Sequence, residues 1–361
     1  MRKPFKLCIL HIGTEKTGSS SIQAFLSRNR RALLKDGVFY PDTGAVGTQW
    51  EFVALAHKAP WVMDIGHVLN ITDKQSQQTF KTRFLENFTK QITQVEMGGT
   101  LLISSEHFHS RLNTKAMVAN LKSILDPFVE DYKILVYFRR QDEVAVSLFS
   151  TQVKSGFEGI ELTLPGPKSP VPYYDYASLV SRWADAFGLD KMHGAIYDQA
   201  LGHGYGILPD FCDKVDIDLE GKKVPKWQNS SVSAVGLKFI QAVNKLYKDE
   251  DGAMSARERF ELIQRSSAVN MGKFYPLSED QAKSFYARFS DSNEQLRLML
   301  FPENPAPLFL EDFSQYPKTA ETLPNDDESF IQTVKAWRKP QRGQRLRDLA
   351  KKTKRLLQGK P

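Results

Sequence analysis

The chain has 361 residues, of which 41% are hydrophobic and 25% charged, with 22 glycines and 18 prolines. This is the composition of an ordinary globular chain of one large or two modest domains, which excludes a disordered protein, a collagen and a membrane bundle. The two cysteines, Cys8 and Cys212, are too few for a disulfide framework or a structural zinc site. We therefore expect a reducing compartment and a cytoplasmic protein.

The net charge of +7 is gathered at the C-terminus. Residues 335–361 contain eleven lysines and arginines and a single acid, Asp348, so the rest of the chain is slightly acidic. The net charge therefore gives no argument for nucleic-acid binding, and we expect no nucleic-acid partner. Residues 345–357 place leucines on one face of an expected helix and basic side chains around the rest, as in helices that lie on anionic lipid. The basic tail, residues 338–360, therefore predicts a peripheral membrane contact, with a solvated basic end as the alternative.

Apolar runs and helical periodicities predict the elements in chain order. Residues 6–12 form a continuous apolar run that ends at Gly13, as in a strand buried on both faces of a parallel sheet. A loop follows, and then a helix that ends at Asp36-Gly37. Residues 43–80 predict only insertions and short helices. Later strands are expected from residue 100, at 133–138 and at 192–198, and later helices at 78–96, 114–126, 141–156, 176–187, 208–214, 232–248, 255–266 and 279–299.

Strands that alternate with helices predict an α/β fold, a parallel sheet flanked by helices. We expect a single α/β domain over residues 1–315, with a helical C-terminal part from about residue 228, followed by a linker and basic tail over 316–361. No stretch approaches the roughly 20 apolar residues that a membrane-spanning helix needs. Ligands of such sheets bind beyond the carboxyl ends of the strands, where three groups of unusual residues stand in this chain.

The first group is the loop GTEKTG with the serines that follow it. Two glycines allow the backbone to approach a ligand closely, Lys16 adds positive charge, and the start of the next helix presents free amide N–H groups. These are the physical properties of a phosphate-binding loop, although no lysine directly follows Gly18 as in a Walker A motif. The alternative is a turn with a serine N-cap.

The second group is Arg139-Arg140 at the end of a buried strand, with Ser147 in the following helix. A guanidinium at this position suits bidentate contact with a phosphate. The alternative is a surface salt bridge with Asp142 or Glu143.

The third group is Glu106 and His107, which follow the second long strand together with His109. Either Glu106 or His107 could take a proton from a hydroxyl nucleophile. The alternative is a carboxylate that caps a helix or pairs with an arginine. No strand end carries the aspartate with which phosphoryl transferases hold magnesium, and no His/Asp cluster suggests another metal. We therefore expect no metal cofactor.

The loop TEKTGSSS resembles the first nucleotide-binding signature of sulfotransferases that use 3′-phosphoadenosine 5′-phosphosulfate (PAPS), which has the form PKTGTT or PKSGTT. The matching residues are Lys16, Thr17, Gly18, Ser19 and Ser20, and the resemblance implies that they bind the 5′-phosphosulfate of PAPS as co-substrate. Glu15 stands where that family usually has an uncharged residue, and serines replace the paired threonines.

The strand and helix FRRQDEVAVS resemble the second signature of the same family, an arginine at a strand end followed eight residues later by a serine. The match falls on Arg139 and Ser147 and implies binding of the 3′-phosphate. Less specific segments, among them GVFYP and SNEQLRLMLF, resemble bacterial sulfotransferases that act on glycans, so that the resemblance covers most of residues 5–302. It implies a fold of the P-loop nucleotide-binding type.

The resemblance also implies a mechanism, the in-line attack of an acceptor hydroxyl on the sulfuryl sulfur without a metal. Members of the family carry a catalytic His or Glu near the second strand, a place that Glu106 fits best with His107 as competitor. Lys16 would stabilise charge on the transferred group. The implied acceptor is a glycan or another hydroxyl compound, and aromatic residues such as Trp50 and Tyr173 are candidates to border it. Two alternatives stay open, a P-loop-type kinase or nucleotide hydrolase, and a noncatalytic nucleotide-binding protein of the cell envelope.

Overall fold

The computed structural model describes most of the chain up to Glu321. The described residues are 2–44, 48–60, 65–159, 161–166, 168–201, 205–225, 232–249, 254–267 and 274–321. The chain divides into two compact units: unit 1 holds residues 1–145, 164–229 and 280–315, and unit 2 holds 146–163, 230–279 and the chain from 316. The tail proposed to contact membranes lies outside the described residues. Within the described ranges, every helix falls short of the length or apolar character that crossing a bilayer requires.

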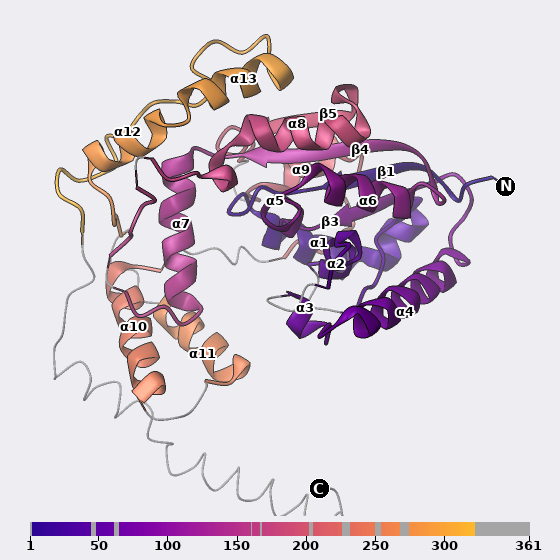
Figure 1. Cartoon of the computed structure of the whole chain (residues 1–361), viewed down its shortest axis with the longest axis horizontal. Helices are drawn as coiled ribbons and strands as arrows, with labels where there is room; N and C mark the ends of the chain where they lie inside the picture. Colours follow the sequence, from indigo (N-terminus) through magenta and orange to yellow (C-terminus); the bar gives the residue numbers. More distant parts are fainter. Residues whose placement is uncertain are drawn as a thin grey trace, which may run out of the picture. The chain divides into compact units, whose positions relative to one another are not determined.

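Unit 1 is built on a five-stranded sheet in the order β2-β3-β1-β4-β5, in which all neighbours are parallel (Figure 1). The strands are β1 (Phe5–His11), β2 (Val38–Phe39), β3 (Gly99–Ser104), β4 (Val129–Phe138) and β5 (Met192–Ile196). The carboxyl-terminal halves of the central strands are buried, which explains the apolar runs in their sequences. The predicted α/β fold with a parallel sheet flanked by helices is confirmed.

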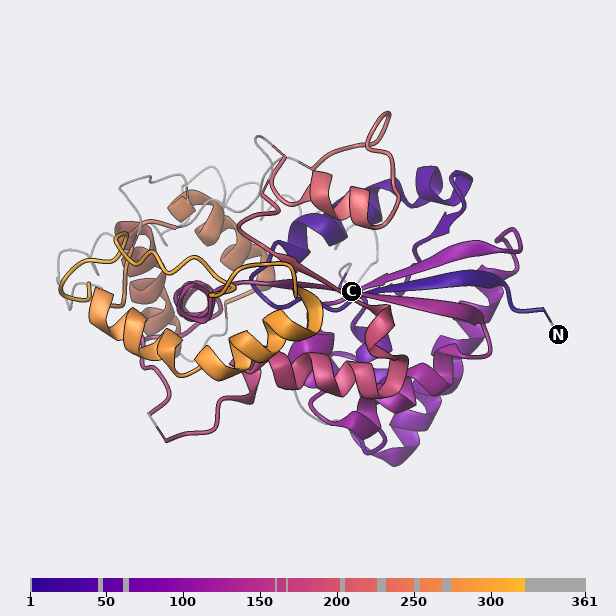
Figure 2. The ribbon, with the colours of Figure 1, turned by 90° about the horizontal axis from the view of Figure 1, so that it is seen from above.

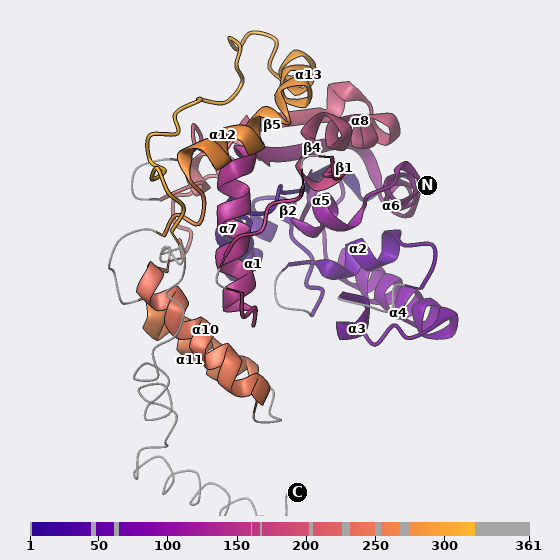
Figure 3. The ribbon, with the colours of Figure 1, turned by 60° about the vertical axis from the view of Figure 1, so that its left-hand side comes forward.

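Helices cover both faces of this sheet, as the view in Figure 2 shows. On one face, α1 (Ser19–Lys35) and α9 (Leu208–Lys214) bury apolar side chains against β1, β4 and β5, among them Phe25 and Phe211. On the other face lie α6 (Lys115–Leu125) and α8 (Tyr176–Phe187), which pack against each other, while α13 (Ser290–Leu300) packs on α8. Two short helices, α2 (Trp50–Ala56) and α5 (His107–Arg111), lie side by side next to α6 (Figure 3). The remaining helices of unit 1 are α3 (Ile65–Val68), α4 (Lys74–Ile92) and most of α12 (Glu279–Ala287), together with single 3₁₀ turns at Pro172–Tyr174 and Leu189–Lys191.

Unit 2 is helical in its described part. Helix α7 (Gln141–Lys154) begins in unit 1 and continues into unit 2, where α10 (Ala234–Asp249) and α11 (Ala256–Ser267) pack against each other. Their shared core consists of Phe149, Val153, Val232, Leu237, Ile240, Val243, Leu262 and Phe274. The amide of Asn244 satisfies two carbonyls at the end of α7, those of Val153 and Phe157.

Three elements differ from the sequence prediction. Strand β2 has only two residues, too few for a recognisable period, and α5 is a single turn and a half directly after β3. The helix expected at 279–299 is two helices, α12 and α13, with a break at Arg288. The guanidinium of Arg288 donates to the carbonyls of Pro165 and Ser169. We attribute the break to such tertiary contacts, which local periodicity does not report.

Candidate active site

The carboxyl ends of β1, β3, β4 and β5 lie at one edge of the sheet because all neighbouring strands are parallel. After β1 the chain turns into α1 on one face, whereas after β3 and β4 it reaches α6 and α8 on the opposite face. The end of β1 is therefore the point at which the connections change sides. In open α/β sheets this is the place where ligands bind.

The loop between β1 and α1 is a tight turn held against β4. Gly13, Lys16 and Gly18 all have positive φ values, of 97°, 68° and 80°. The amide of Thr14 donates to the Tyr137 carbonyl at 2.9 Å, and the Thr17 hydroxyl donates to the Thr14 carbonyl at 2.6 Å. The Thr17 hydroxyl proton is therefore used inside the loop.

Helix α1 begins without a side-chain cap. Its N-cap residue is Gly18, so the serine N-cap considered as the alternative is absent. Within the part of the chain that the structure describes, no group accepts a hydrogen bond from the amide of Ser19 or Ser20. These N–H groups and the positive end of the helix dipole are available for an anion at the end of β1.

Lys16 is partly buried in this loop. Burial lowers the pKa of its ammonium group, the carboxylates of Glu15 and Glu106 oppose that shift, and the Arg139 guanidinium adds to it. The loops after β3 and β4 thus place Glu106 and Arg139 within electrostatic reach of Lys16. The structure brings these residues together from separate parts of the sequence, and their roles in a site stay predictions.

Glu106 stands at the start of α5, directly against the loop after β1. Its carboxylate accepts a hydrogen bond of 2.5 Å from the side-chain amide of Gln23, which is buried on α1. It makes no side-chain cap on α5, which corrects the capping alternative. A carboxylate held by one amide keeps lone pairs for a proton and can act as a general base.

His107 lies beside Glu106 but has different surroundings. Its Nδ1 is 3.8 Å from Oε1 of Glu15, and its ring stands edge-on to that of Trp50 with the centroids 5.6 Å apart. Both candidate bases therefore lie at the same edge of the sheet. Glu106 is hydrogen-bonded to Gln23, and His107 lies beside Glu15 and Trp50.

Glu15 is held by side chains from α5 and from the segment around residue 173, of which the sequence had not singled out Arg111. Its carboxylate lies 3.4 Å from Arg111 and accepts a hydrogen bond of 3.1 Å from the Tyr173 hydroxyl, while its amide points at His109 Nδ1. The other ring nitrogen of His109 lies 2.8 Å from the Tyr173 carbonyl. Burial lowers the pKa of His109 to about 4, so this histidine is neutral at pH 7 and ties the 173 segment to the loop.

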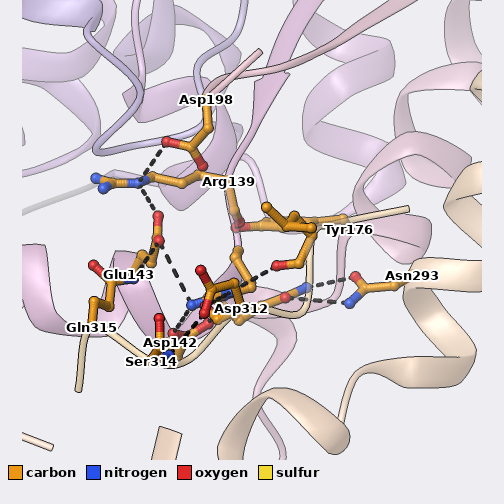
Figure 4. Close-up of polar contacts among 12 residues, drawn as sticks. Arg139, Asp142, Glu143, Tyr176, Asp198, Asn293, Asp312, Ser314 and Gln315 are labelled. Carbon is orange, nitrogen blue, oxygen red and sulfur yellow. Dashed lines mark hydrogen bonds and ion pairs between the residues drawn. The ribbon is translucent and has the colours of Figure 1, made fainter. Parts of the chain in front are cut away.

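Arg139, at the end of β4, faces two carboxylates through one edge of its guanidinium (Figure 4). Its Nε donates to Glu143 at 2.9 Å and lies 3.9 Å from Asp198, and the group stacks over Tyr197 at 5.2 Å. Burial disfavours the charged form, but the Glu143 and Asp198 carboxylates prevail and raise the pKa of Arg139. Among the described residues, none accepts a hydrogen bond from its two terminal nitrogens.

Arg140 has a structural role. Its guanidinium makes two hydrogen bonds to Asp142, of 2.8 and 3.0 Å, and donates to the carbonyls of Leu310 and Asp312, both at 2.7 Å. It also lies 4.2 Å from the centre of the Phe313 ring. The salt bridges considered as the alternative are therefore present, Arg140 with Asp142 and Arg139 with Glu143, but they are largely buried and not on the surface.

The remaining predicted residue, Ser147, lies on α7 in the part that belongs to unit 2. Its joint role with Arg139 stays a prediction. Over the described ranges, no group of three or more His, Cys, Asp and Glu side chains is arranged to hold a metal ion.

Sequence reasoning missed Gln23, Glu143 and Asp198 as site residues. Asp198 follows β5 at the same edge of the sheet. The expectation that no strand end carries an aspartate is therefore wrong for β5, although Asp198 faces Arg139 and joins no group arranged to hold a metal ion among the described residues.

No family model matches the chain. An uncharacterised protein of Archaeoglobus fulgidus is 28% identical over 171 residues, 45% of this chain and 44% of that protein, so the chain spans less than half of that relative.

Three sulfotransferases are among the solved structures to which the chain is similar. The sulfotransferase from Alicyclobacillus acidocaldarius has a TM-score of 0.37 at 15% identity, covering 71% of this chain and 98% of its own. The sulfotransferase domain from the curacin biosynthetic pathway has a TM-score of 0.31 at 13% identity, with 61% and 77% covered. The sulfotransferase domain from the Synechococcus PCC 7002 olefin synthase has a TM-score of 0.28 at 13% identity, with 61% and 76% covered. Because these scores lie below 0.5, the functional argument rests on the residues of the site.

Proposed function

We propose that the protein is a sulfotransferase that moves the sulfuryl group of PAPS to an acceptor hydroxyl. One observation carries the proposal: an uncapped helix start with Lys16 lies within electrostatic reach of a strand-end arginine and a candidate base. The first two groups suit the two anionic ends of the nucleotide, and the third suits a hydroxyl nucleophile.

The reaction would divide among these residues as follows. The acceptor oxygen forms a bond to sulfur while the bond from sulfur to the bridging phosphate oxygen breaks, and 3′-phosphoadenosine 5′-phosphate (PAP) leaves. Glu106 would accept the acceptor proton, supported by Gln23. Lys16 and the amides of Ser19 and Ser20 would stabilise charge on the transferred group and the leaving oxygen, a contribution of about 10²–10³ in rate for each such donor. Transfer without a metal is part of the proposal.

The acceptor is proposed to be a glycan or a related hydroxyl compound. Support comes from Trp50, whose ring lies against His107, and from Tyr173, which is tied to Glu15. Tyr174 instead packs between Phe285 and Phe289 in the protein interior.

Association with the inner face of a membrane through residues 338–360 remains part of the proposal. It is tested by co-sedimentation with anionic vesicles, in which the full chain should sediment with the vesicles and a chain ending at residue 337 should not.

The proposal is tested by incubating the full chain with ³⁵S-labelled PAPS and a panel of glycans, with and without a chelator. We expect label on an acceptor and release of PAP, with no loss of rate in the chelator. Hydrolysis of ATP that needs magnesium would support the kinase or hydrolase alternative instead. PAP binding without transfer to any acceptor would support the noncatalytic alternative.

A further inference from the structure

Glu143 is the residue that fixes the direction of Arg139. It stands on the first turn of α7, four residues after Arg139, and its Oε2 accepts the Arg139 Nε hydrogen at 2.9 Å. Nε joins the guanidinium to the rest of the side chain, so this contact does not use the two terminal nitrogens. Figure 4 shows these nitrogens directed away from Glu143 and Asp198.

The other oxygen of Glu143 is also held. Oε1 accepts a hydrogen bond of 3.1 Å from the side-chain amide of Gln315 and lies 3.7 Å from Arg140. Arg140 binds the same C-terminal segment through the carbonyls of Leu310 and Asp312. The segment 310–315 therefore anchors Glu143, and Glu143 in turn anchors Arg139. With a side chain only 16% exposed, Glu143 has little freedom to adopt another rotamer.

Charge alone would make Glu143 a disadvantage in a nucleotide site. A carboxylate close to a bound phosphate repels it, and Asp198 adds a second negative group on the same arginine. Burial raises the pKa of Glu143, but its charged and hydrogen-bonding partners, Arg139 foremost, lower the pKa by more. Glu143 is therefore ionised at pH 7. Glu143 therefore has two effects of opposite sign on phosphate binding. Its charge repels the phosphate, whereas its contact with Arg139 orients the guanidinium that binds the phosphate.

We propose that Glu143 is a positioning residue for the 3′-phosphate of the nucleotide, which holds Arg139 Nε so that both terminal nitrogens face that phosphate together. The inference rests on the proposed function. A bidentate contact requires both nitrogens in one plane with two phosphate oxygens, so orientation should outweigh the repulsion.

The experiment measures the affinity of the full chain for PAP and for adenosine 5′-monophosphate (AMP), which lacks the 3′-phosphate. The ratio of the two dissociation constants isolates the 3′-phosphate from the rest of the nucleotide. Variants are Glu143→Ala, Glu143→Gln and Gln315→Ala. Glu294→Ala serves as the matched control because it removes a carboxylate from the Arg297 pair on α13, away from the site.

We expect Glu143→Ala to weaken PAP binding about tenfold with less than a twofold change for AMP, because mispositioned groups lose interaction energy without losing charge. Glu143→Gln retains an oxygen that can accept from Nε and should recover most of the affinity. Gln315→Ala should act in the same direction, and its effect should not add to that of Glu143→Ala because both act through one contact. If Glu143→Ala does not fold, Gln315→Ala carries the test.

An unchanged or increased preference for PAP in Glu143→Ala would overturn the inference, because it would show that Glu143 does not orient Arg139 for the phosphate. If Glu143→Ala does not fold, the same outcomes in Gln315→Ala would overturn it. Equal binding of PAP and AMP by the wild-type chain would instead overturn the proposed function, and with it the 3′-phosphate site. Failure of the inference would be seen in the variants, and failure of the proposed function in the wild-type chain, so the experiment distinguishes the two.

Discussion

Gly13 and Glu106 join the loop after β1 to the end of β3 by direct backbone contact. A Cβ atom at Gly13 would lie 3.1 Å from Cα and 3.3 Å from Cβ of Glu106, closer than side chains normally approach. Gly13 also has φ of +97°, a conformation that residues with a side chain rarely adopt. The absence of a side chain therefore allows the candidate base to lie next to the loop that we propose binds an anion.

We expect Gly13→Ala to reduce activity more than stability, because the new methyl group displaces Glu106. Gly37→Ala is the matched control: Gly37 has φ of +79°, but a Cβ there would meet no atom within 4 Å. Both variants should lose stability by about 1 kcal/mol from backbone strain, measured by urea unfolding. Equal turnover in the two variants would show that the contact with Glu106 has no catalytic importance.

The identity of the general base is decided by comparing Glu106→Gln with His107→Gln at saturating PAPS. Loss of a general base lowers kcat by about 10²–10⁴, and we expect this loss for Glu106→Gln. Glutamine keeps the shape of the side chain, so the KM for PAPS should stay within twofold. A larger loss of kcat in His107→Gln would assign the proton transfer to His107.

Asp198 should destabilise the folded protein at neutral pH. Burial and the neighbouring Glu143 carboxylate raise its pKa. A carboxyl with a raised folded-state pKa makes folding less favourable above that pKa, and this penalty disappears as the pH falls through it. We therefore expect Asp198→Asn to have a higher Tm than the wild type at pH 7 and the same Tm near pH 3.

The exposed Asp190 provides the control for this measurement, since Asp190→Asn should leave Tm unchanged at both pH values. Removal of the Asp198 charge should also strengthen binding of PAP. A lower Tm of Asp198→Asn at pH 7 would mean that the attraction between Asp198 and Arg139 outweighs both opposing effects.

His11 should make the fold sensitive to acid. It is fully buried at the end of β1, where its Nδ1 lies 2.8 Å from the Ser104 hydroxyl, and burial lowers its pKa to about 3. A histidine with a depressed folded-state pKa favours the unfolded chain once the pH falls below its unfolded value near 6.5. Its contribution to the free energy of unfolding should fall by about 2 kcal/mol between pH 7 and pH 5.

We expect His11→Gln to reduce the loss of stability between pH 7 and pH 5 by that amount, whatever its stability at pH 7. His57 and His109, whose pKa values burial lowers to about 4, retain part of the pH dependence. His67→Gln, at an exposed position, is the control. An unchanged pH dependence of stability in His11→Gln would show that protonation of His11 does not contribute to acid unfolding.

The sequence predicted the central strands and longer helices because each is a buried apolar run or has a clear helical period. It also predicted that Lys16, Glu106 and Arg139 lie at one edge of the sheet, since parallel strands bring their carboxyl ends together. It did not locate Gln23 or Gln315, because each becomes a partner of the site only through contacts between residues distant in the chain, 83 residues apart for Gln23 with Glu106 and 172 for Gln315 with Glu143. The distinct roles of Arg139 and Arg140 likewise depend on tertiary partners.

We propose that the loop after β1 and the end of β4 bind opposite ends of one nucleotide. Calorimetric titration of PAP into the wild type, Lys16→Ala and Arg139→Ala, with Lys115→Ala at an exposed salt bridge as control, tests it directly. We expect both site variants to bind PAP at least tenfold more weakly, Arg139→Ala to lose the preference for PAP over AMP, and the control to bind as the wild type does. Unchanged affinity for PAP in both site variants would contradict the account.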